Sequence, residues 1–247
     1  MAPEESYVPG TEHPVEVAEA PPAESIDDIA RQRGHRLTGL LIANLVVGSL
    51  GVLTGLVQWV LVAGIREGRD FSNHLLTVSD WTSIGIDLIQ GVLFLVTAIF
   101  WLRWLHASYK ALERRQGEAL RFTPGWAVGY WFIPLVNLLR PYQVMEELRA
   151  QSQSITDEPF AKAQASTIGF WWVLWVASHF VNRTDTRLAL RAETFEQITF
   201  STVFSIGADA LMLGLTAIAL MVIRHLVALQ LQWQPFEEDI ALEVDND

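Results

Sequence analysis

Residues 37–65 form an uninterrupted stretch of 29 residues without a charged side chain. A helix needs roughly 20 apolar residues to cross the hydrocarbon core of a bilayer, so this stretch is long enough to span one. The whole chain of 247 residues is 51% hydrophobic and contains 10 Trp, which favours one membrane bundle over soluble modules. We therefore expect an integral membrane protein.

Both ends of the chain are acidic. Residues 1–28 contain eight acids and no Lys or Arg, and the stretch from residue 233 adds six more acids, so the two ends hold 14 of the 28 acids. Their low apolar content predicts disordered tails at 1–30 and 233–247, around a membrane domain at 31–232. All 17 Lys and Arg lie in that domain, which makes it mildly basic while the formal net charge is −11. An acidic chain argues against nucleic acid as a partner. The chain has no Cys, which excludes disulfides and thiolate chemistry.

Four further apolar stretches follow the first, at 81–105, 126–139, 167–181 and 200–223. The first and last of these are long enough to span, whereas the two in the middle have only 14 or 15 residues, which also suits re-entrant segments. We expect 167–181 to cross, and 126–139 either to cross or to re-enter. The predicted fold is an all-α polytopic membrane helix bundle of five membrane segments, four or five of which span.

Basic residues near the span ends predict the orientation of the chain. Arginines precede the first span, and a second group of bases follows the second span at 103–121, whereas the loop between these spans has only Arg66 and Arg69. Positive residues stay in the cytoplasm, so we expect the N-terminus and the 103–121 loop there. The remaining bases favour neither side for the C-terminus.

Asp87 and Asp209 are the first candidate functional residues, because each lies inside a predicted span. A carboxylate in a membrane costs several kcal/mol unless it faces water or a partner, and such acids often mark ion or proton paths. The alternative is structural: Asp87 near the interface, and Asp209 paired within the bundle.

Asn44 is a third candidate, on a helical face that it shares with Gly48, Gly51 and Gly55. Small residues on that face predict close helix packing, either within the chain or between protomers. A similar stripe of Gly and Ala runs through 207–217.

Histidines and tryptophans suggest less specific roles. His106, His179 and His225 lie toward the ends of apolar segments, and two of them on facing helices would be needed to ligate a haem. Interfacial histidines without a ligand are commoner, so no cofactor is predicted. No metalloprotease, hydrolase, P-loop or dinucleotide-binding pattern occurs. Most Trp lie near segment ends, which predicts an aromatic belt.

One block of the sequence is more informative about the protein's family than the composition is. Residues 101–112 read WLRWLHASYKAL, residues 120–148 read LRFTPGWAVGYWFIPLVNLLRPYQVMEEL, and residues 169–175 read GFWWVLW. Over about residues 40–232 the chain closely resembles the bacterial membrane family called domain of unknown function 4328. The resemblance implies a bacterial inner (cytoplasmic) membrane protein with a kinked central segment, and it implies no activity. The candidate family-motif residues are Pro124, Gly125, Trp126, Pro134, Asn137, Arg140, Pro141, Tyr142 and Gln143.

The prolines of this block also carry a physical prediction. Pro124 suits the first turn of a helix, Pro134 breaks a helix, and Pro141 can start the next one. In that next helix Val144, Met145 and Leu148 are predicted to lie on the bilayer, with Glu146 and Glu147 in water, as in an interfacial helix. A plain connector helix is the alternative.

No pattern in the sequence specifies a reaction. Our leading hypothesis is a non-enzymatic scaffold or accessory subunit that works in the lipid bilayer through protein partners or as a homo-oligomer. The alternative is a small transporter, channel or proton-coupled component that uses Asp87 or Asp209. A haem or quinone redox protein is a third hypothesis.

Overall fold

The computed structural model describes residues 25–116, 120–156 and 161–233. These residues form helices joined by turns and short connections and contain no strand, which confirms the predicted all-α class. The elements in chain order are α1 (Ile26–Arg66), α2 (Asn73–Gln116), α3 (Pro124–Gly129), the 3-10 turn η2 (Val136–Leu138), α4 (Arg140–Thr156), α5 (Ala161–Arg191) and α6 (Phe195–Leu231).

Helices α1, α2 and α6 are long and apolar enough to cross a membrane. They contain the stretches 37–65, 81–105 and 200–223, for which the sequence predicted spans. Helix α5 contains the fourth stretch, 167–181, and has 31 residues, but it is not among the helices that qualify by composition. Three of the predicted spans therefore have support from length and hydropathy.

The remaining predicted segment, 126–139, does not form a span. It contains the end of α3, which has six residues, then turns and η2, which has three. Six helical residues cover only about 9 Å, so the five-span alternative is wrong. The prolines explain the break: Pro124 lies in the first turn of α3, and the helix ends at Gly129, before Pro134.

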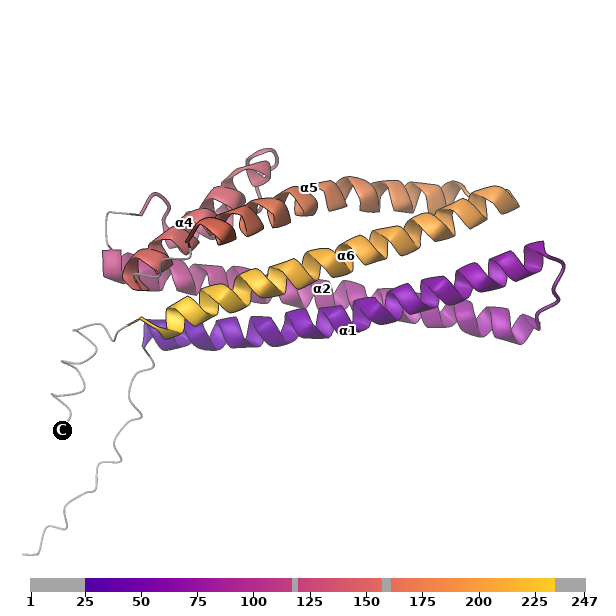
Figure 1. The fold of residues 1–247 in the computed structure, drawn as a ribbon, viewed down its shortest axis with the longest axis horizontal. Helices are drawn as coiled ribbons and strands as arrows, with labels where there is room; N and C mark the ends of the chain where they lie inside the picture. The colour runs from indigo at the N-terminus through magenta and orange to yellow at the C-terminus, as the bar shows by residue number, and fades with distance from the viewer. Residues whose placement is uncertain (1–24, 117–119, 157–160, 234–247) are drawn as a thin grey trace, which may run out of the picture.

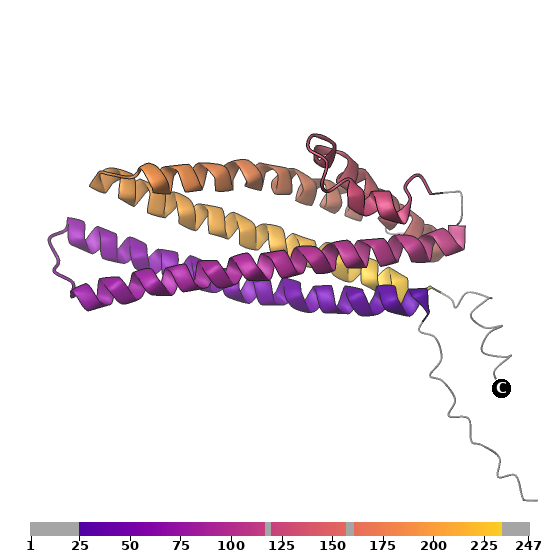
Figure 2. The same ribbon diagram turned by 180° about the vertical axis from the view of Figure 1, so that it is seen from behind.

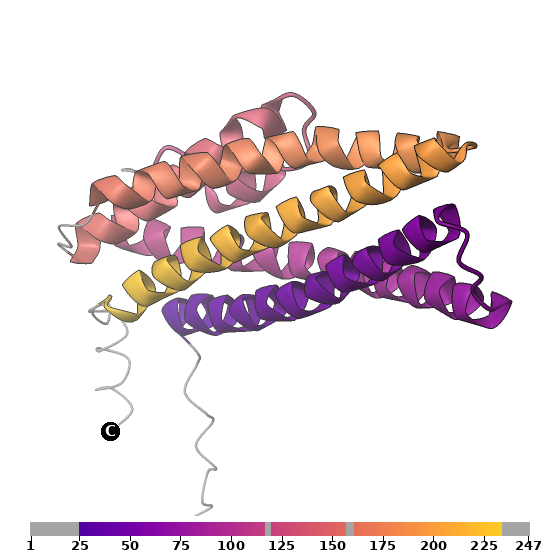
Figure 3. The ribbon, with the colours of Figure 1, turned by 45° about the vertical axis from the view of Figure 1, so that its right-hand side comes forward.

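The long helices form two antiparallel hairpins, α1 with α2 and α5 with α6 (Figure 1). We call the end where α1 begins and where α2 and α6 end the tail end, and the end with the 67–72 and 192–194 connections the loop end. Helices α3 and α4 lie at the tail end (Figures 1 and 2). There the hairpins pack closely, and toward the loop end they diverge (Figure 3).

Helix packing follows an open arc. Helix α5 packs on α6, α6 on α1, and α1 on α2, while α4 contacts α2, α5 and α6 at the tail end. In the described chain α2 and α5 are not a closely packed pair; Trp101 of α2 stacks on Trp171 of α5 near the tail end. Helices α2 and α5 are therefore the two edges of the arc.

Glycines allow the close approach of α1 and α6. A Cβ atom on Gly48 would lie 2.9 Å from Leu213, and one on Gly55 would lie 2.9 Å from Ile206. The predicted stripe on α1 thus packs within the chain. The stripe at 207–217 does not: a Cβ atom on Gly207 or Gly214 would meet nothing within 4 Å in the described structure, so packing within the chain is wrong for it.

The core lies in the tail half of the bundle. Val144, Met145 and Leu148 of α4 are fully buried there, so their predicted position on the bilayer is wrong. The reason is that α2, α5 and α6 cover this face of α4. In the loop half large apolar side chains such as Leu88 and Leu95 are exposed, as expected for helices whose solvent is lipid.

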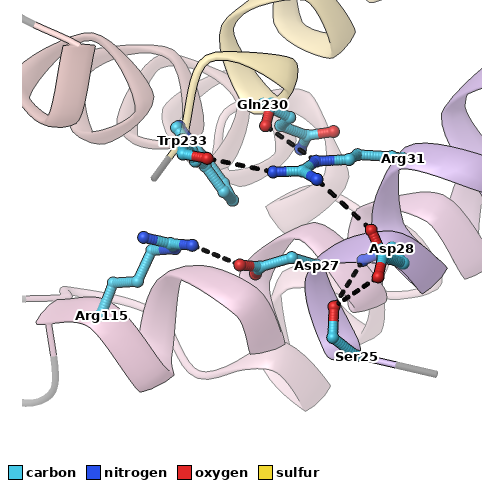
Figure 4. Close-up of polar contacts among 7 residues, drawn as sticks. All are labelled: Ser25, Asp27, Asp28, Arg31, Arg115, Gln230 and Trp233. Carbon is cyan, nitrogen blue, oxygen red and sulfur yellow. Dashed lines mark hydrogen bonds and ion pairs between the residues drawn. The ribbon is translucent and has the colours of Figure 1, made fainter. Parts of the chain in front are cut away.

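A polar cluster ties the chain together at the tail end (Figure 4). Helix α1 begins at Ile26, where the Ser25 hydroxyl caps the helix by accepting from the Asp28 N–H. Residues 26–30, included in the predicted tail, are therefore helical, and the rest of both predicted tails, apart from Ser25 and Trp233, lies outside the described residues. Asp27 pairs with Arg115 of α2, and Arg31 donates to the carbonyl oxygens of Gln230 and Trp233.

Candidate functional site

A cavity of about 890 Å³ lies between α1, α2, α5 and α6. It is within the usual size range of ligand pockets. The three polar residues that the sequence singled out, Asp87, Asp209 and Asn44, come from three different helices and all line this cavity. The fold thus brings them to one site.

Asp185 of α5 is a third carboxylate in the same cavity. It accepts a hydrogen bond of 2.5 Å from the Ser205 hydroxyl of α6. The charges of Asp87 and Asp185 both act on Asp209, so the three carboxylates are within electrostatic range of one another. No Lys or Arg is among the described residues that line the cavity, and no ion pair there involves these acids. The cavity is therefore negative.

Sequence reasoning missed Asp185 because it lies beyond the apolar stretch 167–181, close to arginines that indicate solvent. A usable signal was present. Ser178, Asn182 and Asp185 follow one another at intervals of four and three, which puts them on one face of a continued helix. In the structure all three line the cavity.

Asn44 crosslinks α1 and α2. Its side-chain N–H donates to Thr97 Oγ1 at 2.7 Å, and its Oδ1 accepts from Gln90 Nε2 at 3.0 Å. Gln90 and Thr97 were not predicted as site residues, although both line the cavity. The Gln90 Oε1 atom has no hydrogen-bond partner despite being buried. Asn44 thus has a structural role in the wall of the cavity.

Four tryptophans form the wall of the cavity nearer the tail end. Trp101 and Trp171 stack with their ring centroids 5.3 Å apart, and Trp131 lies edge-on to Trp101 at 6.1 Å and to Trp175 at 5.7 Å. Trp101 and Trp171 are only 8% and 4% exposed, and their indole N–H groups have no partner. The predicted aromatic belt is wrong for this group, because the rings pack on one another inside the bundle.

The candidate family-motif residues lie mainly outside the cavity, in the region that α3, η2 and α4 form at the tail end. The Trp126 ring stacks on Tyr130, and the Arg140 guanidinium lies over the Phe122 and Tyr130 rings, 5.8 Å from each centroid. Arg140 also donates to the Gln143 side chain at 3.1 Å. Trp131 and Phe132, between the predicted motif positions, do line the cavity.

The other motif residues shape the backbone or connect helices. Pro124 and Pro141 lie in the first turns of α3 and α4, as predicted. The chain reverses between Pro134 and Asn137, where Leu135 has a φ of 66°. Tyr142 lies close to Gly169 of α5. Of these residues Tyr142 lies against α5, and none of them lines the cavity that holds the three carboxylates.

Of the three histidines considered for haem, only His179 lines the cavity, where its Nδ1 lies 2.7 Å from the Trp175 carbonyl oxygen. His106 and His225 do not line it, so no pair of them faces across this space. Within the described residues no three His, Asp or Glu side chains are placed to hold a metal ion.

Comparison with known proteins gives one match. The model of a family described as "Domain of unknown function (DUF4328)" matches residues 67–228, from the connection after α1 to near the end of α6. No curated protein and no solved structure matches the chain. The matched region covers more than half of the chain and includes all the candidate motif residues, Asp87, Asp185 and Asp209. The chain therefore belongs to the DUF4328 family.

Proposed function

We propose that this chain is a membrane protein of four spans that admits protons or other cations to the acidic cavity, as a small transporter, channel or proton-coupled component. One observation carries the proposal. Three carboxylates, Asp87, Asp185 and Asp209, come from three helices to one cavity that no described Lys or Arg lines. If the helices lie in a membrane, these negative charges have low-dielectric surroundings in which they repel one another, and a bound cation or proton relieves that repulsion.

Helix α5 is the proposed fourth span. It begins beside α4, which packs at the tail end, and it ends at the short connection to α6. If α6 crosses the membrane from the loop end to the tail end, α5 has to carry the chain across in the opposite direction. Its 31 residues are about 46 Å long, which exceeds the roughly 30 Å of the hydrocarbon core.

The proposed orientation places the tail end in the cytoplasm of a bacterium, with the protein in the inner membrane. Four spans put both ends of the chain on that side. The distribution of bases supports it: only Arg66, Arg69, Arg183, Arg187 and Arg191 belong to the loop half, and the other 12 of the 17 bases belong to the tail half.

The scaffold or accessory-subunit hypothesis stays as the alternative. It expects function to depend on partner surfaces, so the cavity carboxylates would be replaceable without loss. Neutralising those carboxylates therefore separates the two hypotheses.

The test measures cation flux in liposomes that contain the purified chain. A pH-sensitive dye in the lumen reports proton movement, and imposed Na⁺ and K⁺ gradients show whether either ion is exchanged. We expect the combined Asp87→Asn, Asp185→Asn and Asp209→Asn variant to move protons at least about tenfold more slowly than the unmodified chain. Asp80→Asn is the matched control, because Asp80 is an exposed acid of α2 that does not line the cavity. Equal flux in the triple variant and the unmodified chain would count against the proposal.

A further inference from the structure

The cavity has two chemically different ends, and the spacing along two helices sets the distance between them. On α2, Asp87 and Trp101 are 14 residues apart, and on α5, Trp171 and Asp185 are also 14 residues apart. The two helices run in opposite directions, and Trp101 stacks on Trp171. Both helices therefore place a carboxylate about 21 Å from the indole pair, toward the loop end. Fourteen residues are close to four turns, so each Asp lies near the face of its Trp.

The cavity lies between the two edges of the arc. Helices α2 and α5 are not closely packed along the described chain, and the stacked pair of Trp101 and Trp171 joins them near the tail end. In the proposed four-span topology, the parts of α2 and α5 between the indoles and the carboxylates lie in the bilayer. A ligand that is soluble in lipid can thus enter between α2 and α5 without crossing an aqueous vestibule.

The walls select the chemistry of such a ligand. The indole end is an apolar aromatic wall lined by the four tryptophans, which suits an apolar or aromatic group. Trp101 and Trp171 are more than nine-tenths buried, and their N–H groups have no partner in the structure. The carboxylate end requires positive charge, because no described Lys or Arg lines the cavity. A small inorganic cation would use only the carboxylates and would leave the apolar wall without a function.

We propose that the cavity binds an amphipathic organic cation that enters from the bilayer between α2 and α5, with its charge at Asp87, Asp185 and Asp209 and its apolar body extending from them along the cavity toward the tryptophans. This inference rests on the proposed function and names the substrate class for the same site. The ligand class is a lipophilic cation with an apolar or aromatic body. A volume of about 890 Å³ accommodates a molecule of drug size.

The test uses tetraphenylphosphonium as the probe, with the full chain in lipid nanodiscs. Binding is followed directly with the radiolabelled probe and by quenching of tryptophan fluorescence. Tetraphenylborate is the matched control ligand, because it has the same shape and the opposite charge. We expect saturable binding of the cation, at least about tenfold tighter than that of the anion, and a loss of at least about tenfold in the triple Asp→Asn variant.

A second variant tests the position of the ligand without changing a charge. Gly91 lines the cavity, and a Cβ atom there would meet nothing within 4 Å, so Gly91→Leu adds bulk at the cavity wall from a position where the Cβ atom has room. Gly85→Leu is its control, since a Cβ atom on Gly85 also meets open space but Gly85 does not line the cavity. We expect Gly91→Leu to weaken binding of the probe at least about tenfold and Gly85→Leu to leave it unchanged.

Three results would overturn the inference. The first is equal binding of the cation and the anion, and the second is binding that neither the triple variant nor Gly91→Leu reduces. The third is absence of probe binding while proton or Na⁺ flux still depends on the three carboxylates, which would leave the proposed function in place. If probe binding and carboxylate-dependent flux are both absent, the proposed function fails as well.

Discussion

Asp27, in the first turn of α1, forms an ion pair with Arg115, in the last turn of α2, at the end of the bundle where α1 begins and α6 ends (Figure 4). The two side chains are only 8% and 10% exposed. The Arg115 guanidinium also lies over the Trp233 ring, 5.2 Å from its centroid. One arginine thus holds the beginning of α1 and the end of α6 against α2.

Asp27→Asn is expected to lower the free energy of unfolding by about 3 kcal/mol, because removing one partner leaves the other as a buried charge with less compensation. The measurement is denaturant unfolding in detergent micelles, followed by tryptophan fluorescence. The adjacent Asp28→Asn is the control. Asp28 pairs with Arg31 but is 56% exposed, so its loss is expected to cost only about 0.5 kcal/mol for the ion pair. Similar losses in the two variants would show that the buried pair has no special role.

Tyr109 of α2 connects the core to α4. Its hydroxyl lies 2.8 Å from the Val144 carbonyl oxygen and 3.0 Å from Glu147 Oε2, and Glu147 also accepts from the Arg121 N–H at 2.6 Å. The residue lies four positions beyond the proposed span at 81–105. Burial raises the pKa of Tyr109 above its ordinary value of 10.0, and the charge of Glu147 and its hydrogen bond raise it further.

The raised pKa predicts a loss of stability in alkaline solution. Above about pH 10 the unfolded chain releases the Tyr109 proton while the folded chain keeps it, so rising pH favours the unfolded state. Below about pH 10 this contribution is fully present. The expected loss is up to about 1.4 kcal/mol for each pH unit above that value. Unfolding measured at about pH 9 and about pH 11 checks it.

Tyr109→Phe is the matched variant for that pH dependence. It removes the titrating group and keeps the ring, so the alkaline loss is expected to be smaller by the contribution of one tyrosine. At neutral pH the free energy of unfolding of the variant is expected to be lower by about 1 kcal/mol, because the hydrogen bond of the hydroxyl is lost. If the free energy of unfolding falls equally fast with rising pH in Tyr109→Phe and in the unmodified chain, Tyr109 is not the source of the alkaline loss.

Gly34 of α1 lies in tight contact with both α2 and α6. A Cβ atom there would overlap Val227 of α6 and would lie 3.1 Å from the Trp104 Nε1 atom. Neither neighbour can yield cheaply, because Val is stiff and Trp104 is fully buried. We expect Gly34→Ala to cost about 1–3 kcal/mol of unfolding free energy.

Gly39→Ala, in the same helix, tests whether that cost comes from packing. A Cβ atom on Gly39 would meet nothing within 4 Å, so the change is expected to stabilise the helix by up to about 1 kcal/mol. Thermal unfolding of the two variants in the same detergent gives the comparison. If both variants unfold at a lower temperature than the unmodified chain, the cost does not come from the contacts of Gly34 with α2 and α6.

Hydropathy predicted much of the fold, because α1, α2 and α6 contain the stretches that are long and apolar enough to cross a membrane. The prolines predicted the break before Pro134 and the helix starts at Pro124 and Pro141, since proline fixes one backbone angle and lacks an N–H. Hydropathy could not decide between a span and a re-entrant segment at 126–139. Whether this segment spans depends on the turn around Leu135 and on the contacts that α4 makes with other helices. Those are tertiary interactions, which hydropathy does not describe.

The candidate site was predicted in part. Asp87, Asp209 and Asn44 were found because a polar group within an apolar stretch is costly and therefore conspicuous. Asp185 was missed because its neighbours along the chain are polar and it is conspicuous only once α5 is known to continue beyond residue 181. The tryptophan wall was missed for a related reason: nearness to a segment end along the chain does not tell whether a ring faces lipid or another ring.

The four-span topology predicts which parts of the chain a reagent outside the membrane can reach. The sequence has no Cys, so a single introduced Cys is the one site for a membrane-impermeant maleimide. Glu67 and Glu193 are exposed in the two connections of the loop end, and Lys110 and Ser154 are exposed at the tail end. In intact spheroplasts Glu67→Cys and Glu193→Cys are expected to react, and Lys110→Cys and Ser154→Cys only after permeabilisation. The pair Ser154 and Glu193 decides whether α5 crosses, because α5 is the helix between them. Labelling of both from one side would refute the fourth span, and a full reversal of the pattern would keep the four spans but place the N-terminus outside the cytoplasm.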